Sequence, residues 1–167
     1  MKVLAVDPGF GRCGVAVLDG DGRGAEVRFS TCIETPAKSA FVDRLTTVVE
    51  TIAHLIEIHK PELFVIEGLF FSNNAKTALQ VAEVRGALLY AATKAHVPIH
   101  EVHPGAAKIA LTGYGKATKA QMMFMVEKLT KLPMEKRLDD EFDAIALGLA
   151  ALAENAHRAT MIRSGVL

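Results

Sequence analysis

Residues 2–9 read KVLAVDPG, a short apolar run that ends in an acidic residue and a turn. Such a run, bounded by Pro-Gly, predicts a buried strand over residues 3–6. A second apolar run, 13–18, follows at once, and after a reversal at residues 20–24 the alternating stretch 25–34 predicts a third strand. Strands joined by such short turns must be antiparallel, so the first third of the chain is expected to form a three-stranded meander.

The rest of the chain alternates helical and extended patterns. Apolar residues recur at helical spacing from about Ser39 to His59, and Pro61 ends that helix. A continuously apolar run over 63–66 then predicts a strand buried on both faces. The remaining predicted elements are a helix over 74–95, a strand over 98–102 and helices over 105–111, 118–132 and 140–155. Thr118 and Gln121 form a capping-box pattern at the start of one of these helices.

This order of elements predicts an α/β fold. A right-handed crossover from the third strand places the fourth strand beside the first. We therefore expect a five-stranded mixed sheet in the order 3-2-1-4-5, flanked by helices. Ligands of open α/β sheets bind at the carboxyl ends of the strands, where the direction of strand addition reverses. Here that point lies between the first and fourth strands.

The composition predicts one compact domain. With 167 residues, half of them hydrophobic, the chain can bury a sizeable core. We expect this domain to span residues 1–155, followed by a mobile tail over 156–167 that has few core candidates. No secretory signal or membrane-length apolar stretch is recognisable, so a cytoplasmic protein without membrane contact is expected. Cys13 and Cys32 could meet across the hairpin, but reduced packing cysteines are the preferred interpretation.

Charge is distributed unevenly along the chain, although the net charge is zero. A neutral chain is a poor candidate for a general nucleic-acid binder. Between residues 104 and 137, however, seven basic side chains accompany only two acidic ones. A basic rim beside an acidic centre suits an enzyme that grips a phosphate backbone and cuts it. A solvated helix face that carries lysines explains the charge run equally well when it is taken alone.

Four carboxylates are distinguished by their positions. Asp7 and Glu67 close the apolar runs of the first and fourth strands. Asp140 and Asp143 share one face at the start of the last long helix. Structural alternatives exist, because Asp-Pro-Gly is common turn chemistry and acidic residues stabilise the first turn of a helix. The structural alternative is weakest for Glu67. The positions of the four acids are explained together if all four belong to one functional site.

The chemistry of such a set points to divalent metal ions. Two carboxylates about 4 Å apart repel by roughly 4 kcal/mol at an effective dielectric of about 20, so four converging acids need a cation. Oxygen ligands without nearby Cys or His favour Mg²⁺, with Mn²⁺ as a substitute. Two such ions can activate water and stabilise the leaving oxygen of a phosphodiester. The residues thus predict a metal-dependent phosphodiester hydrolase.

Four stretches, in order, resemble motifs of the RuvC-type Holliday junction resolvases. They are residues 6–14 (VDPGFGRCG), 61–70 (ending in IEGLF), 74–86 (ending in VRG) and 140–144 (DEFDA). The resemblance covers residues 2–153. It implies an RNase H-like fold and a homodimer that cuts four-way DNA junctions by paired symmetric nicks during recombination and repair. It also implies that Asp7, Glu67, Asp140 and Asp143 hold Mg²⁺, with two ions per site.

The resemblance implies further roles outside the carboxylates. Phe70 would stack on bases near the branch point, with core packing as the alternative for this side chain. Lys108 and Lys119 match family lysines near the scissile phosphate, where Lys119 is expected to take part in catalysis by stabilising the developing charge. Lys116 is expected to contact phosphate, and Arg85 is expected among the DNA contacts.

Partners are less sharply indicated by the sequence. The helix over 74–95 is apolar on more than one side, which fits either full burial or packing against both the sheet and a partner. The resemblance favours the homodimer, and branch-migration motor proteins are further candidate partners. Gly68 and the pair Glu83-Val84 depart from the family pattern, which leaves the sequence preference of cleavage open.

Three other functions fit parts of the sequence. Asp7-Pro8-Gly9 after a strand also opens the actin-like ATPases and sugar kinases, but those proteins need two such lobes. A protein that binds junctions without cutting them is a second alternative. An RNase H-like nuclease acting on another nucleic acid, such as an RNA–DNA hybrid, is a third. The complete acidic set, the apolar helix and Phe70 favour the junction endonuclease.

Overall fold

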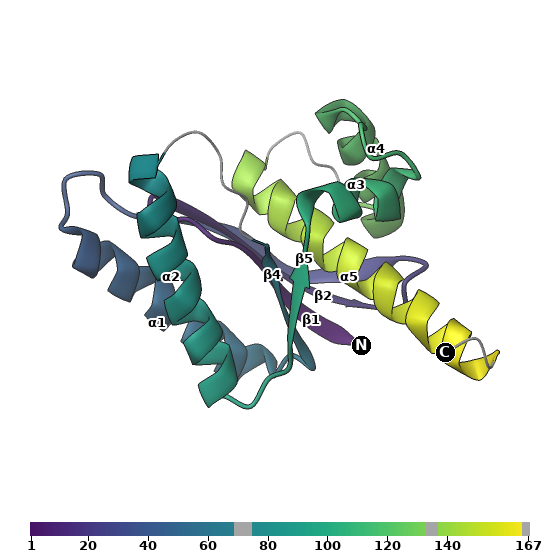
Figure 1. Ribbon diagram of the computed structural model, residues 1–167, viewed down its shortest axis with the longest axis horizontal. Coiled ribbons are helices and arrows are strands. Elements are labelled where there is room, and N and C mark those ends of the chain that lie inside the picture. The colour runs from purple at the N-terminus through teal and green to yellow at the C-terminus, as the bar shows by residue number, and fades with distance from the viewer. Residues whose placement is uncertain (69–74, 133–136, 165–167) are drawn as a thin grey trace.

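A computed structural model of the protein describes residues 1–68, 75–132 and 137–164. Within these ranges a five-stranded sheet in the order β3-β2-β1-β4-β5 has helices on both faces (Figure 1). The strands are β1 (Lys2–Asp7), β2 (Arg12–Gly20), β3 (Ala25–Glu34), β4 (Leu63–Glu67) and β5 (Ile99–Val102). β2 runs antiparallel to β1 and β3, whereas β4 runs parallel to β1 and β5. The predicted strand order and mixed sheet are confirmed.

The helices form a layer on each side of the sheet. They are α1 (Phe41–His59), α2 (Ala75–Lys94), α3 (Pro104–Thr112), α4 (Lys119–Thr130) and α5 (Asp139–Arg163). α1 and α2 cover one face, and α5 lies across the other with α3 and α4 beside it (Figure 1). The Thr118–Gln121 capping box is present at the start of α4, as predicted.

The last helix is longer than its sequence pattern predicts. α5 continues to Arg163, past the expected end at Asn155, so most of the predicted tail over 156–167 is helical. The physical reason is local: no Gly or Pro interrupts the chain before Gly165, and the added segment contains good helix formers such as alanine and arginine. The helix end expected at residue 155 is corrected, whereas the mobility of the tail and the domain boundary at residue 155 stay predictions.

Alternation along the central strands sends side chains to two separate cores. Val3, Ala5 and Val65 pack in the core under α5, whereas Leu4 and Phe64 pack in the core under α1 and α2. Because successive side chains point to opposite faces, the residues two positions after Ala5 and Val65 belong to the α5 face. The carboxylates that end β1 and β4 are thereby directed toward α5.

Glycines allow α5 to approach the sheet closely. A Cβ added at Gly14 of β2 would lie 1.8 Å from the Asp140 carbonyl oxygen in the first turn of α5. A Cβ at Gly148 would lie 2.5 Å from Leu18 Cδ1. Both contacts are far inside van der Waals distance, but only the one at Gly14 is with a backbone atom, so a residue without a side chain is required where the start of α5 crosses the sheet.

The two cysteines lie on opposite faces of the β2–β3 hairpin. Cys13 pairs with Ile33, and Gly14 pairs with Cys32. Directly opposed residues share a face, and neighbouring residues do not. Both thiols are free, and Cys13 packs in the core under α1 and α2, whereas Cys32 is only partly buried.

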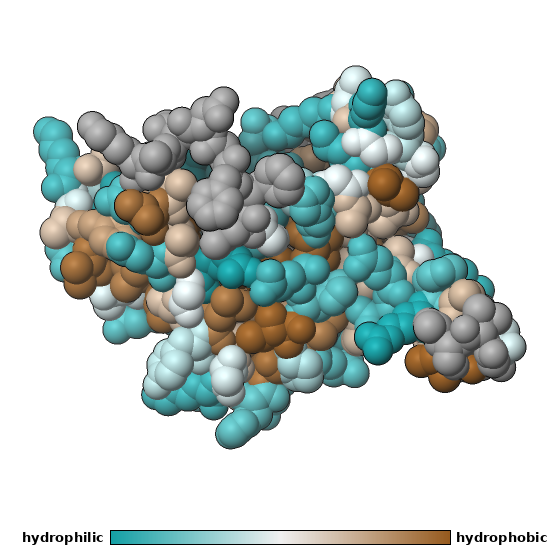
Figure 2. Space-filling view, viewed as in Figure 1, coloured by the Kyte–Doolittle hydropathy of each residue, from teal (hydrophilic) through white to brown (hydrophobic). Residues whose placement is uncertain are grey.

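The surface is mostly hydrophilic in the view of Figure 2, with several hydrophobic areas, one of which lies over the region where Figure 1 shows β5. Ile99 of this edge strand is 36% exposed. Among the described residues, no helix has both the length and the hydropathy that crossing a bilayer requires.

Candidate active site

Asp7 and Glu67 end the neighbouring parallel strands β1 and β4. The residues that precede them are paired in the β1–β4 register, so both acids lie at one edge of the sheet. The Asp7 carboxyl donates a hydrogen bond to the Glu67 carboxylate. Burial, followed by the negative charges of Glu67, Asp143 and Asp140, raises the pKa of Asp7 to about 8. Burial also raises the pKa of Glu67. The two strand ends therefore bring a proton-sharing pair of acids together.

The start of α5 supplies the other two carboxylates. Asp140 Oδ2 lies 3.1 Å from Arg12 Nε, and Asp143 Oδ2 lies 3.8 Å from Lys119 Nζ. Burial raises the pKa of Asp143, against the opposing effect of the Lys119 charge. Since the charges of Asp140 and Asp143 also act on Asp7, all four predicted acids share one electrostatic environment.

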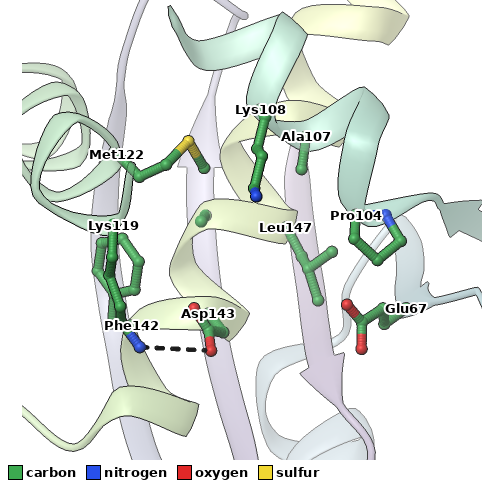
Figure 3. Close-up of a pocket in the computed structure, with 10 residues that line it drawn as sticks. Glu67, Pro104, Ala107, Lys108, Lys119, Met122, Phe142, Asp143 and Leu147 are labelled. Atoms are coloured by element: carbon green, nitrogen blue, oxygen red, sulfur yellow. Dashed lines mark ion pairs between the residues drawn. The ribbon is translucent and has the colours of Figure 1, made fainter. Parts of the chain in front are cut away.

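A cleft of about 300 Å³ opens beside these acids (Figure 3). Glu67 and Asp143 line it together with Lys108 of α3 and Lys119 of α4. The Lys108 side chain extends from α3 toward the cleft, opposite the carboxylates of Glu67 and Asp143 (Figure 3). Lys119 Nζ also lies 5.6 Å from the ring centre of Phe142, which forms part of the wall. The cleft thus places two cations beside two of the four acids.

The donor set fits a hard divalent cation in its chemistry. Its members carry carboxylate oxygens, and the partly buried Asp7 holds a proton near neutral pH, as expected for a ligand that lacks its cation. Within the described ranges, no three Asp, Glu, His or Cys side chains are grouped closely enough to form a ready-made metal site. Two cations offset part of the repulsion among the acids of α5, since Arg12 pairs with Asp140 and Lys119 pairs with both Asp139 and Asp143.

The other predicted site residues lie in different surroundings. Lys108 and Lys119 line the cleft, whereas Lys116 is exposed in the loop before α4 and does not. Phe70 lies outside the described residues. Arg85 departs from the expectation of a DNA contact: its side chain is buried and bonded to the Glu67 carbonyl and the Glu101 carboxylate. A guanidinium held in this way has its donors directed inward, so the structure does not support that role.

Three further residues belong to the site and were not singled out in the sequence. Arg12 pairs with Asp140, Asp139 lies 3.1 Å from Lys119, and the electrostatic interaction with His103 lowers the pKa of Glu67. One of them could have been found. His103 directly follows the strand predicted beside that of Glu67, and the ends of parallel strands meet at one edge of the sheet.

The raised acid pKa values predict that the metal-free protein loses stability as pH rises. The pKa of Asp7 is about 8 in the folded protein, above its ordinary value of 3.8, so the folded state binds the extra proton between these values. The contribution of Asp7 to the free energy of unfolding is therefore largest in acid and falls by on the order of 1–3 kcal/mol between pH 5 and 8. Thermal unfolding in chelator across this range measures the loss. The Asp7→Asn variant should show a flatter profile, and an equally steep one would contradict this assignment.

Comparisons with known proteins agree on one family. A family model described as crossover junction endodeoxyribonuclease RuvC matches residues 3–151. A curated relative of that name from Thermotoga petrophila is 35% identical over 161 residues, which cover 96% of this chain and 98% of the relative. One from Parafrankia sp. is 39% identical over 153 residues, covering 91% and 86%. The structure of T. thermophilus RuvC in complex with Holliday junction substrate matches with a TM-score of 0.89 at 26% identity, covering 94% of this chain and 96% of that one.

Proposed function

The chain belongs to the family of RuvC crossover junction endodeoxyribonucleases, and we propose that Asp7, Glu67, Asp140 and Asp143 form its catalytic centre. It has the RNase H-like fold of that family and resolves four-way DNA junctions by cutting phosphodiester bonds in recombination and repair. The family depends on divalent metal ions. For this chain we propose Mg²⁺, replaceable by Mn²⁺, with two ions per site.

One observation gives the main support for the proposed catalytic centre. Asp7 is partly buried among the charges of three other carboxylates, and two of these, Glu67 and Asp143, line a cleft that also holds two lysines. Buried acids that repel one another destabilise a fold unless a cation neutralises them, so their grouping favours a functional role. When bound, a divalent ion supplies a Lewis acid that lowers the pKa of water and offsets charge on the phosphate.

The chain's own groups would orient the substrate. Asp7 and Glu67 stand on adjacent strands, which are more rigid platforms than loops, while Asp140 and Asp143 stand on the first turns of α5. Lys108 and Lys119 carry positive charge to the cleft, where it would stabilise the charge that develops on the scissile phosphate. We propose Lys116 as a peripheral phosphate contact, since it lies exposed in the same basic region.

Replacement of Lys119 should slow the chemistry and weaken DNA binding modestly. Lys119→Ala removes a fixed charge from the cleft, and we expect cleavage to slow by about 10²-fold. The slope of log K against log salt concentration should fall by about one. Single-turnover cleavage and binding titrations at several salt concentrations measure both effects. Lys94→Ala is the control, because Lys94 lies in the last turn of α2, away from the cleft. Equal kinetics for the two variants would reduce Lys119 to a surface lysine.

The substrate specificity is tested by offering three nucleic acids to the same protein. These are a synthetic mobile four-way junction, a linear duplex and an RNA–DNA hybrid, each with Mg²⁺ and then with chelator. We expect paired symmetric nicks on the junction in Mg²⁺ alone. Preferential cutting of the hybrid would favour the alternative RNase H-like activity, and binding without cutting would favour a junction-binding protein.

We also propose a homodimer as the active form. The apolar character of α2 supports it, since Leu79 and Tyr90 of this helix are 70% and 67% exposed. A twofold dimer would present two equal cleavage centres to a junction of matching symmetry. Branch-migration motor proteins and a cytoplasmic location stay predictions.

A further inference from the structure

Arg85 of α2 is a buried arginine that bonds directly to Glu67, a residue of the proposed centre. Its side chain is 10% exposed. Nε donates a hydrogen bond to the Glu67 carbonyl oxygen at 3.2 Å, and Nη2 lies 2.5 Å from the Glu101 carboxylate. One guanidinium thus holds two neighbouring strands, β4 through its last residue and β5 through Glu101, near their carboxyl ends.

The end of β4 is where such a restraint matters. Among the described residues, the last backbone bond from this strand to β5 is the one that the Gly68 N–H donates to the Val102 carbonyl at 3.0 Å. Glu67 must direct its carboxylate toward Asp7 and the cleft from the last position of the strand. A rotation of the peptide at Glu67 would redirect this side chain, and the Arg85 bond opposes that rotation at the carbonyl of the same residue.

We propose that Arg85 is a positioning residue that fixes the direction of the Glu67 carboxylate. This inference rests on the proposed role of Glu67 in the catalytic centre. A guanidinium suits the task because its planar fork donates in several directions at once, and it stays charged at every pH at which the protein folds. The ion pair with Glu101 compensates the positive charge of the buried Arg85 guanidinium. The Glu101 side chain itself is 55% exposed.

The test replaces the guanidinium by an apolar side chain of similar length. Arg85→Met should lower the single-turnover cleavage rate by about 10–100-fold, the usual range for residues that orient metal ligands. The concentration of Mn²⁺ needed for half-maximal thermal stabilisation, measured without DNA, should rise by a similar factor. Junction affinity in chelator should stay within about twofold of the original protein, with an unchanged salt slope, because Arg85 does not contact the phosphate backbone.

Matched variants separate positioning from other roles. Arg28→Met removes an exposed arginine that also pairs with a glutamate, Glu26 on β3, and should change neither cleavage nor the Mn²⁺ requirement. Arg85→Lys should recover part of the rate, because it keeps the charge and a donor. If Arg85→Met does not fold, Glu101→Gln tests the same restraint from its exposed end and should raise the Mn²⁺ requirement by a few-fold.

Two results would overturn the inference. One is an unchanged rate and Mn²⁺ requirement in folded Arg85→Met, even if its thermal stability falls. The other is weakened junction binding with a smaller salt slope, which would make Arg85 a DNA contact. A parallel assay of Glu67→Gln tests the premise separately. If Glu67→Gln cuts junctions normally, the proposed centre is wrong, whereas a defect in Glu67→Gln without one in Arg85→Met rejects the positioning role alone.

Discussion

Asp7→Asn is expected to lower junction cleavage by about 10³-fold or more while leaving junction binding intact. The variant loses a ligand of the ion that stabilises charge in the transition state, which raises the activation free energy by about 4 kcal/mol or more, since each tenfold in rate corresponds to about 1.36 kcal/mol. The substitution keeps the size of the side chain and removes its charge. Asp7 interacts with all three other acids of the proposed centre, so its charge is central to cation binding. Junction binding depends chiefly on phosphate contacts made by basic residues and should not suffer.

The same substitution distinguishes catalysis from stability. Because the raised pKa of Asp7 destabilises the metal-free fold at pH 8, Asp7→Asn should unfold at a higher temperature than the original protein in chelator. An inactive variant that is more stable cannot owe its inactivity to unfolding. Gel-shift titration in chelator and single-turnover cleavage in Mg²⁺ provide the two measurements.

A control lies at the opposite end of the sheet. Asp19 on β2 pairs with the N-terminal amine and faces Lys2 in the β1–β2 register, away from Asp7. Asp19→Asn should cut junctions at the normal rate. Undiminished cleavage by Asp7→Asn would remove Asp7 from the centre, and a parallel loss in both variants would mean that the effect is not local.

Gly14→Ala is expected to cause the second large loss, through displacement of α5. The added methyl would lie 1.8 Å from the Asp140 carbonyl oxygen, and this is a backbone atom that no rotamer change can move. The first turn of α5 must therefore shift away from β2. We expect a destabilisation of about 1–3 kcal/mol, typical of overpacking. Cleavage should fall by about 10²-fold, because a shift of about 1 Å in a catalytic group has effects of this size.

The matched control for this substitution is Gly86→Ala in α2. A Cβ at Gly86 meets no other atom within 4 Å, so the methyl is accommodated. Since alanine is a better helix former than glycine, the variant should gain up to about 1 kcal/mol in stability. Thermal unfolding of both variants and single-turnover cleavage by Gly14→Ala form the experiment, since Gly86 lies on the same face of α2 as the exposed side chains of Leu79 and Tyr90 and serves as a control for stability alone. Normal cleavage by a well-folded Gly14→Ala would show that the spacing of α5 and β2 does not govern the site.

Much of the fold follows from local pattern in the sequence. The hairpin turn at residues 20–24, the apolar strand over 63–66 and the capping box at Thr118 are each written within a few neighbouring residues. Short-range preferences decide such features, and the rule of right-handed crossovers then leaves one strand order. The end of α5 was missed because the stretch after Asn155 carries no stop signal, while the few apolar residues there had suggested a tail.

The candidate site was predicted in its residue types but not in its contacts. Asp7 and Glu67 could be placed together because both end strands at the point where the sheet reverses its direction of growth. The role of Arg85 as a DNA contact stays a prediction, which its bonding within the protein does not support. Its charge suggested a phosphate contact, yet the side chain points inward to Glu101 and the Glu67 carbonyl. Periodicity does not report which way a long, flexible side chain turns at the rim of a core.

Sequence alone thus determined which residues carry negative charge at strand ends and at the first turn of a helix, because strand length, turn chemistry and capping are local properties. Only the tertiary structure decided how close those charges lie. The approach of α5 to β2 depends on the missing side chain of Gly14, and the raised pKa of Asp7 depends on burial under that helix. Distances between remote segments arise from packing, which involves all the side chains between them at once.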